Sequence, residues 1–172
     1  MRTSVCCFTG YRPEKMPSGY QEGSRLFCDM QVQLCQAIHR AYAHGCRYFL
    51  SGMSRGFDLW AAQAVLALRG EGLPIELWAA VAFPDMHVHW EPIWRTRYQH
   101  TLAQASRTFC IFPRYMPECY AVRDRFLVER SCRCICFFDG TPGGTAYTVH
   151  YAHKHHLIID NLADQQLSLF DM

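Results

Sequence analysis

The sequence predicts an α/β protein with three layers, in which a mainly parallel sheet is covered by helices on both faces. Short apolar runs alternate along the chain with longer segments whose apolar residues recur at helical spacing. The apolar runs are nearly continuous rather than alternating, which is typical of parallel strands buried on both sides. Glycine-bearing turns follow three of these runs, at the points where a strand would lead into a helix.

Each predicted element follows from its local pattern. Residues 24–44 carry apolar side chains every three or four positions, from Leu26 to Ala41, and Gly45 is a typical helix stop. Residues 58–68 are rich in alanine and leucine, which favours a second helix. Further helices are predicted at 91–105, 118–130 and 146–153, and strands at 3–8, 46–50, 75–82, 108–112, 132–138 and 157–159.

Length and composition predict one domain in a cytoplasmic protein. The 172 residues suffice for one sizeable core, which we place at 1–160, and we expect 161–172 to form a flexible tail. A net charge of +2 gives no electrostatic footprint of a general nucleic-acid binder, so direct nucleic-acid binding stays open. No stretch is apolar enough to cross a membrane, and no signal peptide is recognisable. We expect the ten cysteines to be reduced and mostly buried, and we predict no metal site.

Three glycine-bearing turns carry the prediction of a ligand site. They span residues 9–13, 51–58 and 139–145, each after a predicted strand. In an open α/β sheet, ligands bind outside the carboxyl ends of the strands. Glycine there lets the backbone approach a ligand, and the following helix offers free N–H groups to a phosphate. The set therefore predicts a nucleotide or another phosphorylated ligand, with no cofactor required.

These turns also carry a resemblance to a known family. The motifs Cys7-Phe8-Thr9-Gly10-Tyr11-Arg12-Pro13, Ser51-Gly52-Met53-x-x-Gly56-x-Asp58 and Pro142-Gly143-Gly144-Thr145 stand in the order found in the SLOG superfamily. That group includes the DNA-processing protein DprA, the LOG phosphoribohydrolases and small YpsA-like proteins of bacteria and their mobile elements. The likeness covers roughly residues 3–160, and the chain is most similar to the single-domain YpsA-like branch.

The resemblance implies a Rossmann-like fold that binds a nucleotide or nucleotide-derived ligand, as a sensor or a nucleotide-processing module. Relatives often pair, so a homodimer is also implied. Carried over by position, the ligand-binding residues are Thr9, Gly10, Arg12, Ser51, Gly52, Met53, Arg55, Gly56, Asp58, Gly143, Gly144 and Thr145.

Several of these residues also have a purely structural interpretation. Asp58 either caps the second helix or accepts a hydrogen bond from a ribose hydroxyl. Arg12 and Arg55 either pair with phosphate oxygens or lie on the surface. Ser51 either donates to a phosphate or closes its turn.

Two aromatic residues after the third strand are candidates for stacking against a base. Trp90 and Tyr98 lie eight residues apart, with Trp94 between them, and so share one helix face. The same spacing is equally a packing pattern.

Catalysis is where the sequence departs from the LOG enzymes. They cleave the N-glycosidic bond of nucleoside 5′-monophosphates with an arginine and a glutamate, and Thr148 stands where the glutamate is expected. A carboxylate would stabilise the oxocarbenium-like transition state of such a cleavage. Arg123 and Arg125 are both candidates for the arginine, and the neighbouring acids, Asp124 among them, are expected to be solvated partners. We therefore favour ligand binding, with LOG-like hydrolysis as the alternative.

The tail carries a separate motif. Gln166, Leu167, Ser168, Leu169 and Phe170 resemble the short peptide by which bacterial replication and repair proteins bind the sliding clamp. The alternative is that these apolar side chains pack back on their own domain. Clamp binding would make the chain a DNA-replication or repair accessory protein, similar to DprA, and deletion of residues 165–172 would abolish clamp association.

Overall fold

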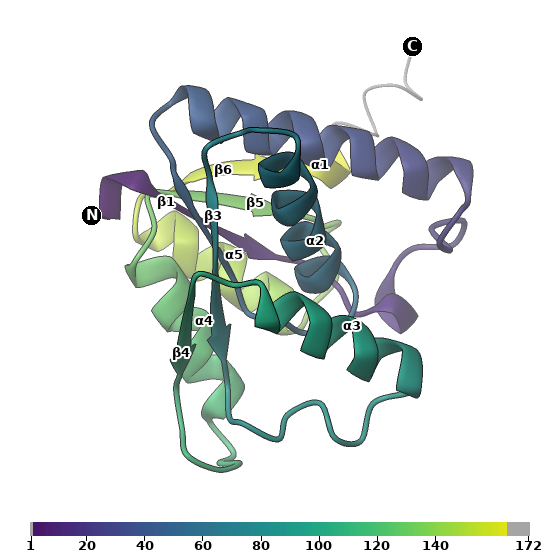
Figure 1. The fold of residues 1–172 in the computed structure, drawn as a ribbon, viewed down its shortest axis with the longest axis vertical. Helices are drawn as coiled ribbons and strands as arrows, with labels where there is room; N and C mark the ends of the chain where they lie inside the picture. The colour runs from purple at the N-terminus through teal and green to yellow at the C-terminus, as the bar shows by residue number, and fades with distance from the viewer. Residues whose placement is uncertain (1, 165–172) are drawn as a thin grey trace.

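A computed structural model describes residues 2–164 and shows a six-stranded sheet in which every neighbouring pair is parallel (Figure 1). The strand order is β4-β3-β2-β1-β5-β6. The strands are β1 (Val5–Thr9), β2 (Tyr48–Ser51), β3 (Glu76–Val81), β4 (Arg107–Cys110), β5 (Arg133–Cys136) and β6 (Ile158–Asn161).

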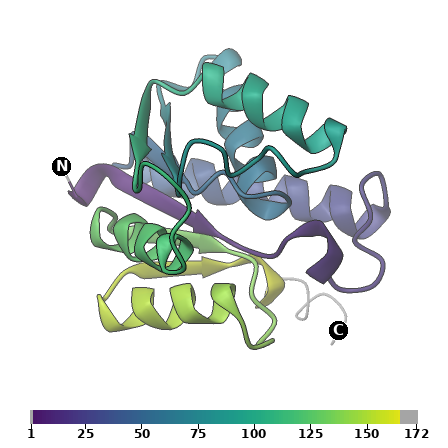
Figure 2. The same cartoon turned by 90° about the horizontal axis from the view of Figure 1, so that it is seen from below.

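Five α-helices form the two outer layers. They are α1 (Arg25–Ala43), α2 (Phe57–Gly70), α3 (Pro92–Ala103), α4 (Cys119–Glu129) and α5 (Gly144–Lys154), with 3-10 turns η1 (Arg2–Ser4) and η2 (Pro13–Lys15) beside β1. Helices α1, α2 and α3 cover one face of the sheet, and α4 and α5 cover the other (Figure 2). The buried residues accordingly form two hydrophobic clusters, one on each face. The predicted three-layer Rossmann-like fold is confirmed.

Local sequence explains how the first helix is placed. The Ser24 hydroxyl accepts a hydrogen bond from the backbone N–H of Phe27 at 3.2 Å, so serine caps α1. Gly45 adopts a positive φ of 102° just beyond the helix, where other residues are strained. Met30, Leu34 and Ile38 repeat at four-residue spacing and are all fully buried.

The order of the strands creates a switch point beside β1. The chain passes from β1 outward through β2, β3 and β4, then returns to place β5 on the other side of β1. Crossovers to opposite faces leave a crevice at the carboxyl ends of the two neighbouring strands, which is where open α/β sheets bind ligands.

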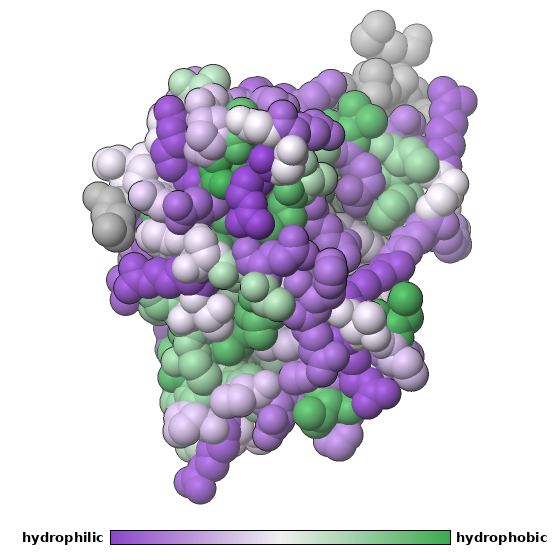
Figure 3. Space-filling view, in the orientation of Figure 1, coloured by the Kyte–Doolittle hydropathy of each residue, from purple (hydrophilic) through white to green (hydrophobic). Residues whose placement is uncertain are grey.

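The surface differs between the middle and the edge of the molecule. Hydrophilic residues cover much of the face seen in Figure 3, while hydrophobic residues are more frequent toward the region of β3 and β4. Strand β4 is an edge strand with mostly exposed residues. Among residues 2–164, no helix combines the length and apolar character needed to span a bilayer.

The end of the chain differs from the prediction. Asn161, expected in a loose tail, is the last residue of β6. Its side-chain amide accepts a hydrogen bond from the Phe138 N–H at 3.0 Å and donates one to the Phe138 carbonyl at 2.8 Å. Leu162 and Ala163 are buried in the core. The fold thus continues past residue 160, because an asparagine side chain completes the backbone hydrogen bonds beyond β5. The clamp-like motif Gln166–Phe170 lies outside the described residues.

Candidate functional site

A cavity of about 440 Å³ opens at the switch point. Four segments line it: the end of β1 with the turn that follows, the start of α2, one side of α4, and the loop between β5 and α5. Its size is within the range of pockets that hold small ligands. The cavity brings together seven of the predicted ligand residues and one arginine candidate: Thr9, Gly10, Arg12, Asp58, Gly143, Gly144, Thr145 and Arg123.

The first two glycine turns are packed directly against each other. A Cβ atom on Gly10 would lie 2.4 Å from the Phe57 ring, and one on Gly56 would lie 2.5 Å from the Tyr11 carbonyl oxygen. The Phe57 N–H donates to that same carbonyl at 3.0 Å. Both glycines therefore allow the two turns to pack closely, and Gly56 also has a φ of 84°, which favours glycine. Gly56 does not line the cavity.

The second turn is closed from within. Ser51 is fully buried, donates from its hydroxyl to the Asp58 carbonyl at 2.9 Å, and accepts from the Met53 N–H at 3.1 Å. Met53 has a φ of 64°, which a non-glycine residue rarely adopts, and its side chain is fully buried in the core. Ser51 thus closes the turn, and neither residue lines the cavity.

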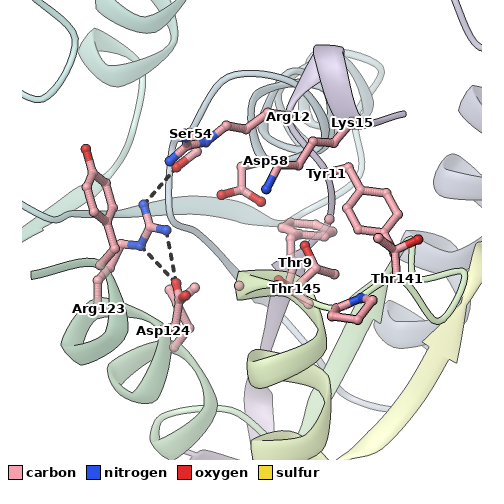
Figure 4. Close-up of a pocket in the computed structure, with 17 residues that line it drawn as sticks. Thr9, Tyr11, Arg12, Lys15, Ser54, Asp58, Arg123, Asp124, Thr141 and Thr145 are labelled. Atoms are coloured by element: carbon pink, nitrogen blue, oxygen red, sulfur yellow. Dashed lines mark hydrogen bonds and ion pairs between the residues drawn. The ribbon is translucent and has the colours of Figure 1, made fainter. Parts of the chain in front are cut away.

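Arg123 joins α4 to the second turn. Its guanidinium donates to the Gly52 carbonyl at 2.8 Å. It also donates to the Ser54 hydroxyl at 3.0 Å and twice to the Asp124 carboxylate at 3.1 and 3.0 Å (Figure 4). A Cβ atom on Gly52 would lie 2.9 Å from the guanidinium carbon. Gly52 is therefore glycine because the buried arginine occupies that space, and Gly52 itself does not line the cavity.

The orientation of α4 about its axis determines which of the two candidate arginines faces the cavity. The Arg123 side chain is 7% exposed and faces the cavity, whereas Arg125 bonds the Tyr147 hydroxyl at 3.2 Å outside it. Asp124, expected to be a solvated partner, is only 15% exposed and lines the cavity. The expected pairing with a neighbouring arginine is confirmed, but Asp124 is not solvated, because its carboxylate folds back onto Arg123 instead of reaching solvent.

Asp58 is a buried acid inside the cavity. Gly56 is the N-cap of α2 and no side chain caps this helix, so the capping interpretation of Asp58 is wrong. Burial raises the pKa of Asp58 to about 7, against the opposing attraction of Arg123. A carboxyl group with a strongly shifted pKa in a cleft is a typical functional-site residue. In Figure 4 it lies between the Arg123–Asp124 pair and the Lys15 ammonium.

The third turn is held in place by Tyr11. The Tyr11 hydroxyl donates to the Asp139 carboxylate at 2.6 Å and accepts from the Asp139 N–H at 3.1 Å. The same carboxylate accepts from the Thr141 N–H at 3.0 Å. Gly143, the N-cap residue just before α5, has a φ of 146°, and no side chain caps the helix. The first N–H groups of α5, from Gly144 on, therefore have no acceptor within the helix.

Two cations line the cavity, and the Lys15 ammonium is near the start of α5, where a Cβ atom on Gly143 would lie 4.0 Å from its nitrogen. Among residues 2–164, Lys15 and Arg12 form no ion pair, in contrast to Arg123. Arg12 lies over the Tyr120 ring, with 5.9 Å from the guanidinium carbon to the ring centroid. Sequence reasoning missed Lys15, although Pro13 begins a 3-10 turn that brings residues three apart onto one side.

The remaining predicted residues lie outside the cavity. Arg55 pairs with Glu14 at 2.8 Å and Glu91 at 3.4 Å. Trp90 and Tyr98 pack edge to face at 5.4 Å against each other in the α3 layer, and Tyr98 is 1% exposed. The packing interpretation of this pair agrees with the structure. Thr148 is buried and donates to the Gly144 carbonyl at 2.9 Å, away from the cavity.

Metal ligands do not gather at this site. Within residues 2–164, no group of three or more histidine, cysteine, aspartate or glutamate side chains is placed to hold a metal ion.

Comparison with known proteins agrees with the motifs and the fold. A sequence model of the YpsA proteins, described as the YspA SLOG family, matches residues 6–167. The chain belongs to the YspA SLOG family. Among its relatives are UPF0398 proteins of Bacillus cereus strain G9842, 25% identical over 157 residues, and of Bacillus thuringiensis strain Al Hakam, 24% identical over 153 residues. Each alignment covers 87% of this chain and 83% of the relative.

Two solved structures show how this YspA SLOG protein is related in fold. DNA processing protein A from Helicobacter pylori, a single-stranded DNA binding protein, matches with a TM-score of 0.63 and 13% identity, over 97% of this chain and 73% of that one. DprA from Streptococcus pneumoniae matches with a TM-score of 0.61 and 14% identity, over 90% of this chain and 48% of that one. At such low identity the likeness shows the fold alone.

Proposed function

We propose that the switch-point cavity binds a nucleotide or a nucleotide-derived ligand through its phosphate. The observation that carries this proposal is that the uncapped start of α5 lines the same cavity as Lys15 and Arg12, two cations without an ion pair among residues 2–164, with the Lys15 ammonium beside Gly143. Free N–H groups at a helix start and the helix dipole both favour an anion. Family membership and the DprA-like fold support the same class of ligand.

The rest of the cavity suits the sugar of the same ligand. Asp58 and Asp124 present carboxyl groups across the cavity from the start of α5, and ribose hydroxyls are donors that carboxylates accept. The hydrogen bonds that Arg123 makes to its neighbours occupy most of its N–H groups, so we assign it to positioning the second turn rather than to holding the phosphate.

A thermal-shift screen tests the proposal. The purified protein is melted with each nucleoside 5′-monophosphate, with dinucleotides, with ADP-ribose and with inorganic phosphate, because a ligand that binds the folded state raises the melting temperature. At least one phosphorylated compound should raise it, and the charge reversal Lys15→Glu should remove the shift. Arg25→Glu is the matched control, since Arg25 is 95% exposed on α1 and lines no part of the cavity. Absence of a shift with every compound would contradict the proposal.

A second candidate function is favoured by the two carboxyl groups. Thr148 replaces the expected glutamate, yet the cavity contains Asp58 with its raised pKa and Asp124 beside Arg123. N-glycosidic hydrolysis would use such a pair of carboxyl groups, one to donate a proton and one to stabilise positive charge. We infer that LOG-like hydrolysis would use these two aspartates.

Product analysis tests the hydrolase. Incubation with nucleoside 5′-monophosphates should release the free base and ribose 5-phosphate, and Asp58→Asn and Asp124→Asn should each abolish release while leaving nucleotide-induced stabilisation detectable. Binding without products for every nucleotide would reject hydrolysis and leave the binding proposal intact.

A further inference from the structure

A second cavity, of about 280 Å³, lies on the other end of the sheet. It is lined by Arg2, Trp78, Arg107, Phe109 and Arg130, together with Val5 and Glu129. Val5 and Arg107 are the first residues of β1 and β4, and Arg130 follows α4. The cavity is therefore separate from the switch-point site, which lies at the carboxyl ends of the strands and shares no lining residue with it.

Planar side chains make up the floor of this cavity. The Trp78 ring stacks on Tyr48 at 4.4 Å between centroids and meets Phe109 edge to face at 5.9 Å. The Arg107 guanidinium carbon lies 4.5 Å from the Phe109 centroid and 5.4 Å from that of Trp78. Aromatic rings with stacked guanidinium groups form a surface on which further planar rings stack.

Positive charge surrounds that floor. Arg107 and Arg130 are exposed and form no ion pair or side-chain hydrogen bond with any residue in 2–164, and each guanidinium lies over an aromatic ring. Glu129 accepts a bond from the Tyr151 hydroxyl at 2.7 Å. Arg2 donates to the carbonyls of Ser131 at 3.0 Å and His155 at 3.1 Å, just after α4 and α5. It therefore offsets the partial negative charge of two helix ends that would repel an anion.

These features together select the ligand. Trp78 is only 6% exposed, so the plane open to a ligand is the exposed Arg107 guanidinium that lies over Phe109 and Trp78. Such a plane binds rings, and arginines bind phosphate oxygens. A second copy of this chain, docked face to face, would set arginines against arginines. The cavity is smaller than the pockets that enclose a whole free ligand, so it suits one base of a longer polymer. Bases in a duplex are stacked on each other, so their faces are not available to this floor.

We propose that this Arg107–Arg130 site binds single-stranded nucleic acid, with one base stacked on the exposed Arg107 guanidinium above the Trp78–Phe109 floor and a neighbouring phosphate on Arg130. This site is independent of the proposed nucleotide function, because its residues lie at the opposite end of the strands.

Fluorescence anisotropy with a labelled 20-nucleotide oligo(dT) tests the site. The double variant Arg107→Gln/Arg130→Gln should weaken binding at least tenfold. It should also reduce the slope of log K against log salt by roughly 0.7 for every phosphate that is no longer neutralised. Arg25→Gln removes a charge elsewhere and should change the affinity less than twofold. A duplex of the same length should bind at least tenfold more weakly.

Three results would overturn the proposal: no binding by the wild-type protein at low salt, equal weakening by Arg25→Gln, or competition by free dTMP at the affinity of the oligonucleotide.

A second measurement needs no variant. Ultraviolet cross-linking of the wild-type protein to an oligonucleotide with 5-iodouracil should label the peptide that contains Arg107 and Phe109. Labelling confined to residues around the switch-point cavity would equally overturn it.

Discussion

The Arg123 guanidinium donates a 2.8 Å hydrogen bond to the carbonyl oxygen of Gly52, which lies 71 residues earlier in the chain. This contact joins α4 on one face of the sheet to the turn between β2 and α2 on the other. Burial alone would lower the pKa of Arg123, but the carboxyl groups of Asp124 and Asp58 beside it raise that pKa. The geometry of the cavity thus depends on one buried cation.

The first prediction concerns that cation. Arg123→Met should lower the free energy of unfolding by about 3–5 kcal/mol at pH 7, because it leaves buried carboxylates without their partner. Urea denaturation measures the change. Arg125→Met is the matched control on the same helix and should change stability by less than about 0.5 kcal/mol. Equal effects of the two substitutions would contradict the assignment of Arg123 to the cavity.

The second prediction concerns the glycine turns. Gly10→Ala should destabilise the fold by about 1–3 kcal/mol, because the added methyl group overlaps the Phe57 ring. Gly144→Ala, at the start of α5, meets open space and should be nearly neutral. Thermal or urea unfolding of both variants provides the comparison. A Gly10→Ala protein as stable as the wild type would show that the two turns do not pack against each other.

The third prediction is a pH dependence. Asp58 has a pKa raised by burial to about 7 in the folded protein, so the folded state binds a proton that the unfolded state has already released. The stability from this group is complete below about pH 4 and is lost as the pH rises toward 7, by about 1.4 kcal/mol per pH unit. Asp58→Asn cannot titrate, so the variant should gain stability relative to wild type over this range. A difference that stays constant between pH 4 and 8 would contradict the raised pKa.

The fourth prediction concerns the third turn. Tyr11→Phe removes the hydroxyl that bonds both the carboxylate and the N–H of Asp139. We expect a loss of about 1–2 kcal/mol in stability, and weaker binding of any nucleotide that the thermal-shift screen identifies, because the loop before α5 loses its anchor. Tyr147→Phe, on the exposed side of α5, should affect neither quantity by more than a small amount. Unchanged nucleotide affinity in Tyr11→Phe would show that the loop needs no such anchor.

The order of the elements followed from the sequence because apolar periodicity alone determines it. The six apolar runs became six parallel strands, and the turns after β1, β2 and β5 met at one edge as the fold requires. The roles of single residues did not follow. Gly52 has the sequence context of a ligand-binding glycine, yet the reason for it is Arg123, which is distant in sequence. Such a contact has no local signal.

Two further misses have the same cause. Lys15 lines the cavity because the 3-10 turn η2 begins directly after Arg12, a geometry that the sequence shows only through Pro13. Asn161 belongs to the fold because its side chain pairs with the backbone of Phe138. Both depend on where another segment of the chain lies, which local patterns do not report.

Calorimetric titration of a nucleoside 5′-monophosphate and of the matching nucleoside tests the central claim most directly. If the start of α5, Lys15 and Arg12 hold a phosphate, the monophosphate with the preferred base should bind at least tenfold more tightly than its nucleoside. Arg12→Gln/Lys15→Gln should remove most of that difference, and Arg25→Gln should leave it unchanged. Equal affinity for nucleotide and nucleoside in the wild-type protein, or a difference that survives in the double variant, would contradict the account.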